Sequence, residues 1–337
     1  MYKSSLDILM FNCLYSQDEF DLKPAMLQRS VVLKVNGSVP QQKKLSDIAT
    51  GIRQRVLAHS LKNNGGYMSQ ACSSAELLSC IYGGLVNLPE LDTPMLPGEF
   101  AGTPGLDGLN RTTGIDFHGG RHADMDRLVN SPAHYALVIY AAMIETGRLA
   151  EDALDHFNKD GSTVEMIGAE HSPGFETTTG SLSQAISQAA GIALARRTRH
   201  ETGNTWVFMS DGEFQEGQTW EALQAASFYG LNKLKVIVDV NAAQCDGPMD
   251  QVMTIEPLQT RVESFGWKVA RVDGHDTDAI FAAGSIESDQ PLMILCYTDG
   301  TRGLPLLQER YPVLHYLRFT SDQEKSKYEQ AYEEMTR

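Results

Sequence analysis

The second half of the chain alternates short apolar runs with longer amphipathic segments. Residues 205–210 (TWVFMS) and 234–240 (LKVIVDV) are largely apolar runs, typical of strands that are buried on both faces of a parallel sheet. Further strands are expected at 267–272 and 292–298, and helices at 217–229, 256–265 and 277–283. Strands that alternate with helices at this spacing form βαβ units. The pattern therefore predicts an α/β fold with a mostly parallel central sheet, flanked by helices on both faces.

The first half of the chain is less regular. Helices are expected at 45–62 and 73–85, whereas residues 88–122 are rich in proline and glycine. A loop of that length inside a compact domain is usually functional or covers an interface. Residues 1–43 have weak periodicity and are interpreted as an N-terminal extension that precedes a single large domain, 44–337.

Composition excludes several classes of partner. The formal net charge is −15, and lysine and arginine do not cluster, which argues against nucleic acid or an anionic membrane. The five cysteines include no CxxC pair and are expected to be free thiols in a reducing compartment. Because no apolar stretch is long enough to span a bilayer and no signal peptide is recognisable, the predicted location is the cytoplasm.

Two polar residues follow neighbouring strands of the predicted sheet. Asp211 comes directly after 205–210, and Asn241, 30 residues later, comes directly after 234–240. Since parallel strands present their carboxyl ends at one edge of a sheet, both side chains are expected there, together with a loop carbonyl. Such oxygens suit Mg²⁺, or Ca²⁺ or Mn²⁺ in its place. Gly212 would let backbone N–H groups approach a diphosphate; taken alone, Asp-Gly usually indicates only a turn.

The longer segment SDGEFQEGQTWEA…VDVNAAQCDG resembles the thiamine diphosphate motif of transketolases and their N-terminal-subunit relatives. The resemblance implies a thiamine-diphosphate-binding fold in which Asp211, Asn241 and the Ala243 carbonyl hold the metal ion. It also implies that Gly212 contacts the diphosphate. The first glycine of the usual GDG triplet is Ser210 here.

Residues 173–197 resemble the TTG-x-LGQG segment of the same family. By this resemblance, the backbones of Gly180 and Leu182 contact the aminopyrimidine side of the cofactor. Two glycines of the motif are replaced by Ser183 and Ala185, so helix packing there is expected to differ.

Four further residues are candidates by position. His134, in DRLVNSPAH, falls where a family histidine contacts the diphosphate, although a lone histidine at a helix start is more often a cap. Glu216 matches a glutamate of a network that links two active sites; the alternative is a first-turn glutamate favoured by the helix dipole. Cys245 replaces an aliphatic residue that flanks the thiazolium. His171 is the remaining candidate for catalysis.

Several positions depart from the usual pattern. The SGHPGG-type segment becomes NNGGYMSQACSSAELL, in which Tyr67 is the nearest replacement for the expected histidine. This segment also resembles homodimeric pyruvate dehydrogenase first components. His315 is predicted to be a surface residue, and His275, in VDGHD, a structural turn residue. Arg302 is the one candidate for binding a substrate phosphate.

The resemblance implies a transferase that moves a two-carbon ketol unit from a ketose-type donor to an aldehyde acceptor, through a carbanion stabilised by thiamine diphosphate. No second α/β domain is recognisable after residue 298, so the chain is expected to be the diphosphate-binding subunit of a split enzyme. Its partner would be a separately encoded, pyrimidine-binding C-terminal subunit, in an α2β2 assembly. The alternatives are a subunit of an α-keto acid decarboxylase or dehydrogenase, and a catalytically silent structural partner.

Overall fold

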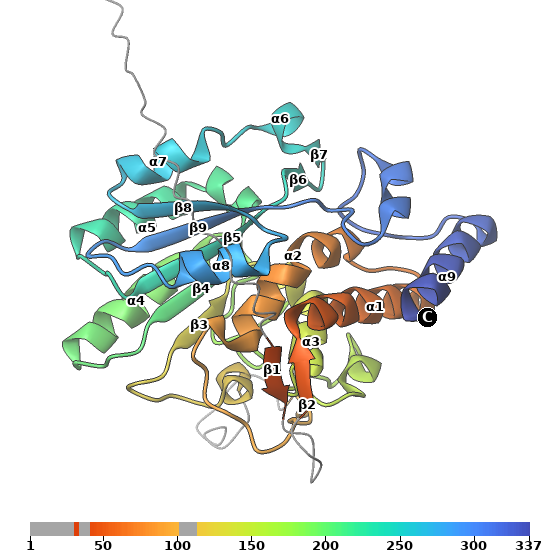
Figure 1. Cartoon of the computed structure of the whole chain (residues 1–337), viewed down its shortest axis with the longest axis horizontal. Coiled ribbons are helices and arrows are strands. Elements are labelled where there is room, and N and C mark those ends of the chain that lie inside the picture. Colours follow the sequence, from red (N-terminus) through yellow and green to blue (C-terminus); the bar gives the residue numbers. More distant parts are fainter. Residues whose placement is uncertain (1–29, 34–40, 101–112) are drawn as a thin grey trace, which may run out of the picture.

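A parallel five-stranded sheet lies at the centre of the molecule (Figure 1). The computed structural model describes residues 30–33, 41–100 and 113–337. All neighbouring strands of the central sheet are parallel. Their order across the sheet is β3 (Arg127–Asn130), β4 (Thr205–Ser210), β5 (Leu234–Val240), β9 (Leu292–Tyr297) and β8 (Lys268–Asp273).

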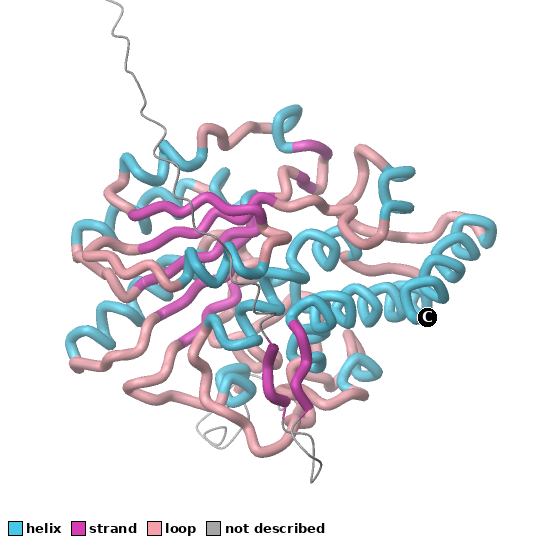
Figure 2. The backbone as a smooth tube through the Cα atoms, viewed as in Figure 1, coloured by secondary structure: helices cyan, strands magenta, loops and turns pink. Residues whose placement is uncertain are grey.

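Helices cover both faces of this sheet, as Figure 2 shows. One face packs against α1 (Leu45–Asn63), α2 (Met68–Cys80), α3 (Ala136–Glu145) and α8 (Thr277–Gly284). The other packs against α4 (Gln184–Thr198), α5 (Gly217–Phe228) and α7 (Leu258–Ser264). Successive strand residues alternate between the two cores: Val236 and Val238 enter the second core, and Ile237 enters the first. The predicted α/β fold with helices on both faces is confirmed.

The remaining elements are short or peripheral. They are α9 (Asp322–Thr336), which packs on α1, a β6–β7 hairpin (Ala243–Gln244 and Gly247–Pro248), α6 (Met249–Val252), and the antiparallel pair β1 (Ser30–Leu33) and β2 (Gln41–Lys44). β2 crosses the predicted boundary at residue 43 and runs directly into α1. The other residues of the predicted extension, and 101–112 of the predicted loop, lie outside the described residues. Within the described ranges, no helix combines the length and the apolar character needed to cross a membrane.

Candidate active site

A cavity of about 430 Å³ opens at the carboxyl edge of the sheet, beside the ends of β4 and β5. It is lined by most of the residues that the sequence singled out: His134, Gly180, Leu182, Asp211, Gly212, Glu216, Asn241, Ala243 and Cys245. These residues come from four separate segments of the chain. Strand ends that lie side by side bring the central ones together, since Ser210 pairs with Asp239 across β4 and β5.

Asp211 is the buried carboxylate of this cavity. It begins the 3₁₀ helix Asp211–Gln215 and is only 2% exposed. Its Oδ2 accepts a hydrogen bond from the Ala242 N–H at 2.7 Å. Burial, together with the nearby carboxylate of Asp239, raises the pKa of Asp211 to about 8. A carboxylate in this position needs either a proton or a cation beside it.

Asp239 is a second buried carboxylate, two residues before Asn241, and it joins three elements. Its Oδ2 accepts hydrogen bonds from Ser73 Oγ of α2 at 2.6 Å and from the Tyr135 hydroxyl at 2.9 Å. Its Oδ1 accepts a hydrogen bond from Thr298 Oγ1, just after β9, at 2.5 Å. Sequence patterns could not identify this role, because all of these partners are distant in the chain.

These contacts orient the side chain of Asn241. Its Nδ2 donates hydrogen bonds to Asp239 Oδ2 and to the Tyr135 hydroxyl, both at 3.1 Å. Its Oδ1 lies at the opposite end of the amide and accepts the Ala243 N–H at 3.0 Å. Ala242, in between, has a positive φ of 54°, which turns the backbone sharply after β5. The amide nitrogen is therefore held inward, and the oxygen remains on the side of the turn and cavity.

Glu213 is a third buried carboxylate and was not predicted. It accepts the backbone N–H groups of Ser210 at 2.8 Å and Ser183 at 2.9 Å, and also the Ser131 hydroxyl. Burial raises the pKa of Glu213, although the hydrogen bonds that it accepts act in the opposite direction. It thereby joins the ends of β3 and β4 to the start of α4. The S-x-x-E spacing of Ser210 and Glu213, a capping box, was the sequence signal for it.

Two histidines and a tyrosine meet at one end of the cavity. The ring centroid of His134 lies 5.4 Å from that of His315 and 5.8 Å from that of Tyr67. Burial, reinforced by His315, lowers the pKa of His134 to about 3, and burial also lowers the pKa of His315. Both rings are therefore neutral at physiological pH and offer hydrogen bonds without charge.

The prediction that His315 is a surface residue is wrong. The ring is partly buried, lines the cavity and pairs through Nδ1 with Gln70 Nε2 at 3.1 Å. Gln70 also lines the cavity, from the first turn of α2. Neither residue could be placed from the sequence, because the segment that carries His315 lies far from α2 in the chain.

The structure places two other candidates away from the cavity lining. His171 Nε2 pairs with Glu165 Oε2 at 2.9 Å, and its ring packs against Phe100 with centroids 4.6 Å apart. Arg302 is exposed on the loop after β9 and does not contribute to the lining. By contrast, the exposed Glu216 and Cys245 both lie on the cavity wall.

The donor chemistry of the cavity fits a metal ion with a diphosphate. The described residues that line it include no lysine or arginine, whereas Asp211, Glu216 and Asp246 are acidic. A divalent cation would offset the negative charge of a diphosphate in this acidic lining, and carboxylate, carboxamide and carbonyl oxygens are suitable ligands for such a cation. Such a mixed set is not a cluster of three His, Cys, Asp or Glu side chains, and the described residues contain no cluster of that kind suited to a metal. At Gly212, the space that a side chain would fill is empty.

Comparisons with known proteins identify the family. Residues 110–314 match the sequence profile described as "Transketolase, thiamine diphosphate binding domain". An uncharacterized transketolase family protein, y4mO of Sinorhizobium fredii (strain NBRC 101917 / NGR234), is 41% identical over 190 residues, covering 55% of this chain and 68% of that protein. The 6-deoxy-6-sulfo-D-fructose transketolase subunit SqwG of Clostridium sp. (strain MSTE9) is 31% identical over 267 residues, 78% of this chain and 87% of that subunit. The chain therefore belongs to the transketolase family and contains its thiamine diphosphate binding domain.

A solved structure supports the same fold. The transketolase from Campylobacter jejuni superposes with a TM-score of 0.65 at 21% identity, over 86% of this chain. The match covers 46% of that enzyme, so the chain spans about half the length of the solved transketolase.

Proposed function

We propose that this chain is the diphosphate-binding subunit of a split transketolase-like enzyme, which moves a two-carbon ketol unit from a ketose-type donor to an aldehyde acceptor. The observation that carries the proposal is that Asp211 and Asn241 lie at the ends of neighbouring parallel strands, on one cavity in which no described lining residue is a lysine or an arginine. The family profile supplies the cofactor class.

When bound, thiamine diphosphate supplies the electron sink that carbanion chemistry requires. In the proposed site, Asp211, Asn241 and the Ala243 carbonyl would hold Mg²⁺, and the backbone at Gly212 would contact the diphosphate. Burial raises the pKa of Asp211, and a divalent ion bound there would favour the ionised carboxylate. His134 completes the diphosphate side of the site.

Other residues of the cavity lining would bind the ring portion of the cofactor. Gly180 and Leu182, just before α4, are proposed to contact the aminopyrimidine side through their backbones, and Cys245 to flank the thiazolium. Glu216 is proposed to join a carboxylate network toward a second active site, since it is exposed at the cavity edge. We do not include His171, because its imidazole pairs with Glu165 outside the cavity lining.

Three uncharged polar side chains of the cavity lining bear on the kind of substrate that it would bind. His134, His315 and Gln70 can exchange hydrogen bonds with hydroxyl groups, as a polyol donor requires, and contribute no positive charge. An anionic group at the far end of such a donor would be bound outside this cavity, by Arg302 or by the partner. The relative SqwG is named for a donor of this kind, a sulfonated ketose.

A separately encoded, pyrimidine-binding subunit is proposed as the partner, in an α2β2 assembly. Two findings support this: the chain matches 46% of a solved transketolase, and SqwG is itself named as a subunit. We propose the cytoplasm as the location and residues 44–337 as one domain.

An α-keto acid decarboxylase or dehydrogenase subunit is the second candidate. It is favoured by Tyr67, which stands beside His134 and His315 where the usual segment of transketolases has a histidine. Product analysis with pyruvate and with a ketose donor, each in the presence of the partner, separates the two reactions.

Calorimetric titration of thiamine diphosphate and Mg²⁺ into the chain mixed with its partner tests the proposal. We expect binding that depends on the metal, and a loss of at least about a hundredfold in affinity for Asp211→Ala and for Asn241→Ala. Asp250→Asn, an exposed carboxylate outside the cavity lining, is the matched control and should bind normally. If the mixture never binds the cofactor, the chain is a silent relative; if the chain turns over substrate alone, the split architecture is refuted.

A further inference from the structure

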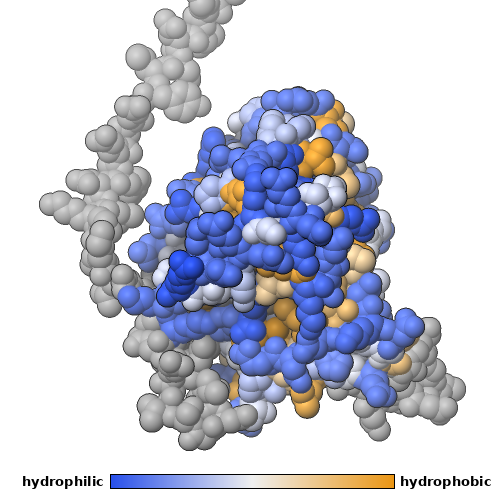
Figure 3. Space-filling model, turned by 90° about the vertical axis from the view of Figure 1, so that its right-hand side faces the viewer, coloured by the Kyte–Doolittle hydropathy of each residue, from blue (hydrophilic) through white to orange (hydrophobic). Residues whose placement is uncertain are grey.

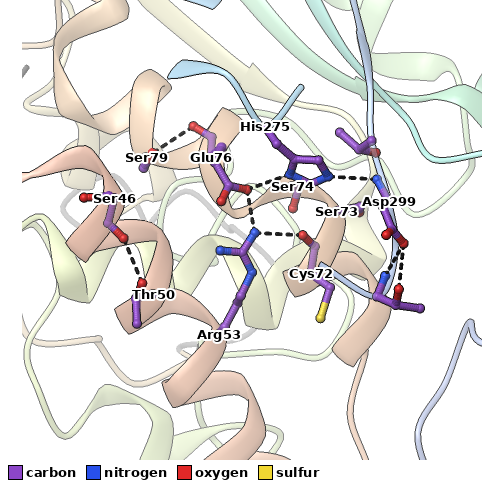
Figure 4. Close-up of polar contacts among 12 residues, drawn as sticks. Ser46, Thr50, Arg53, Cys72, Ser73, Ser74, Glu76, Ser79, His275 and Asp299 are labelled. Carbon is purple, nitrogen blue, oxygen red and sulfur yellow. Dashed lines mark hydrogen bonds and ion pairs between the residues drawn. The ribbon is translucent and has the colours of Figure 1, made fainter. Parts of the chain in front are cut away.

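The VDGHD motif has a structural role that the proposed chemistry does not use. His275, between β8 and α8, joins two segments that are far apart in sequence, as Figure 4 shows. Its Nδ1 lies 3.0 Å from Glu76 Oε2 of α2, and its Nε2 accepts the Asp299 backbone N–H at 2.8 Å. Since a backbone N–H can only donate, the ring proton is on Nδ1 and points to the carboxylate. His275 therefore does more than form a turn.

Glu76 also accepts a hydrogen bond from a third element, α1. Arg53 of α1 donates through Nη2 to Glu76 Oε2 at 2.5 Å and to the Cys72 carbonyl at 2.9 Å (Figure 4). Burial alone would raise the pKa of Glu76, but the hydrogen bonds from His275 and Arg53 lower it, which favours the ionised form. His275 thus binds a carboxylate that is fixed in both position and charge.

The two segments joined by His275 are also joined at the proposed metal site. Glu76 lies one turn after Ser73, and Asp299 directly follows Thr298. Ser73 and Thr298 both donate hydrogen bonds to Asp239, the carboxylate that orients Asn241. The same two elements, α2 and the segment at the end of β9, are therefore connected by two sets of hydrogen bonds. One set is centred on Asp239, on the side of the cavity, and the other on His275, further from it.

The cavity wall depends on the same contact. Ser69 and Gln70, at the start of α2, line the cavity, and a Cβ on Gly300 would lie 3.6 Å from Ser69 Cβ. Within the loop, Asp299 Oδ1 accepts the N–H and the hydroxyl of Thr301, both at 2.8 Å. A displacement of the loop after β9 would therefore reach both Ser69 and the Asp239 contacts.

We propose that His275 is a positioning residue of the active site: by bonding Glu76 and the Asp299 N–H together, it fixes α2 against the end of β9 and so holds Asn241 and the cavity wall in place for the cofactor. This inference rests on the proposed function for its effect on cofactor binding. The contact itself can be tested independently of that function.

Two substitutions separate the two hydrogen bonds. In His275→Gln, the side-chain amide oxygen can reach the Asp299 N–H in place of Nε2. In His275→Asn, the amide nitrogen can replace Nδ1 toward Glu76, but the side chain is too short to reach Asp299. His200→Asn is the matched control, because His200 is exposed and has a positive φ of 58° that asparagine accepts.

Hydrogen–deuterium exchange on the full chain gives the first measurement. We expect residues 299–303 to exchange faster in His275→Asn than in the wild type or in His275→Gln, with little change in the melting temperature. Calorimetry with thiamine diphosphate, Mg²⁺ and the partner gives the second: affinity should fall about tenfold for both His275→Asn and His275→Gln, because each variant keeps only one of the two bonds that make the link.

The outcomes distinguish a failure of the positioning role of His275 from a failure of the proposed function. Wild-type affinity in both variants, or losses that follow the melting temperature, would overturn the positioning role. If the wild type binds no cofactor, the proposed function fails, and the exchange data alone then decide whether His275 holds the loop.

Discussion

Asp239 is the hydrogen-bond acceptor in each of its described side-chain contacts. A substitution that removes an acceptor oxygen is therefore expected to destabilise the site. Asp239→Asn keeps the shape but turns an amide nitrogen toward Ser73, Tyr135 or Thr298, each of which donates now. A hydroxyl that donates now must then turn to accept, or stay unpaired inside a buried site. We expect the free energy of unfolding to fall by about 2 kcal/mol, and the affinity for Mg²⁺ and thiamine diphosphate to fall at least about tenfold.

Calorimetry and urea denaturation check this prediction. Asp250→Asn makes the same chemical change on the exposed surface of α6 and should leave both quantities unchanged. Normal cofactor affinity in Asp239→Asn would show that the orientation of Asn241 does not depend on this carboxylate.

The lowered pKa of His59 is expected to make the free energy of unfolding depend on pH. Its ring is buried in α1 against Phe157, and burial, with Lys62 nearby, lowers its pKa from 6.5 to about 4. Between these values the unfolded chain binds a proton that the folded chain does not, so stability is full above about pH 6.5 and falls as the pH decreases toward 4. From pH 7 to pH 5, the wild type should lose roughly 2 kcal/mol more than His59→Gln does.

Urea denaturation at several pH values measures this difference. His200→Gln, at an exposed position, should keep the wild-type slope. Parallel curves for His59→Gln and the wild type would contradict a lowered pKa at His59.

Residues of the site differ in how far the sequence could place them. Asp211 and Asn241 were predicted to lie together because position after adjacent parallel strands is a local property, and both line one cavity. Asp239 and His315 were missed because their roles arise where distant segments meet. Glu213 has a local signal, its capping-box spacing to Ser210, but its contacts with Ser131 and Ser183 join distant segments, and no spacing along the chain records those contacts.

At the scale of elements, the start of α4 shows how a departure from the family pattern is accommodated. Ser183, where the motif has glycine, keeps a left-handed φ of 71° as N-cap of α4. Its hydroxyl contacts Thr219 Oγ1 and the Glu213 carbonyl, which partly offsets the strain. Ser183→Ala loses these contacts and keeps the strain, whereas Ser183→Gly loses the contacts but relieves it. We expect Ser183→Ala to be less stable than Ser183→Gly by about 1 kcal/mol.

Urea denaturation of both variants beside the wild type measures that difference. Ser181, exposed just before the helix, provides the control pair Ser181→Ala and Ser181→Gly, for which no such difference is expected. Equal stability of the two Ser183 variants would mean that the backbone relaxes out of the left-handed region.

The helices and strands themselves were predicted unevenly, for a physical reason. The strands at 205–210 and 234–240 were predicted at their observed bounds because runs buried on both faces have an unmistakable pattern. The second helix was expected at 73–85; α2 begins earlier, at Met68, and ends at Cys80, but a π-helical segment, Ile81–Leu85, follows it directly, so the predicted start is wrong and the predicted end is confirmed. All residues of α2 are buried, so the sequence has no polar face from which the position of the helix could be read. Its N-cap residue, Tyr67, makes no side-chain capping hydrogen bond, so the start of the helix has no sequence signal either.

At the scale of the whole molecule, two large apolar side chains are exposed at the cavity and beside it. Val252, at the end of α6, lines the cavity and is 43% exposed, and Met253 beside it is 53% exposed. Figure 3 shows apolar patches within a mostly hydrophilic face of the molecule. Large apolar side chains exposed next to a functional cavity are typical of an interface. They fit the proposal that a partner subunit closes the cavity.

Met253→Asp should therefore weaken association with the pyrimidine-binding partner without unfolding the chain, since a charge at an apolar interface must be desolvated. We expect turnover to fall at low subunit concentration, with a dissociation constant raised at least about tenfold, and to recover when the partner is added in excess. The matched control is Phe228→Asp. The helix α5 begins next to Glu216, which lines the cavity, and Phe228 is its last residue, with 82% of its surface exposed. The 12 residues of that helix, at 1.5 Å each, place Phe228 about 18 Å further along its axis. Equal turnover of both variants across the concentration series would locate the partner on another face, whereas a deficit in Met253→Asp alone would locate it at the rim of the cavity.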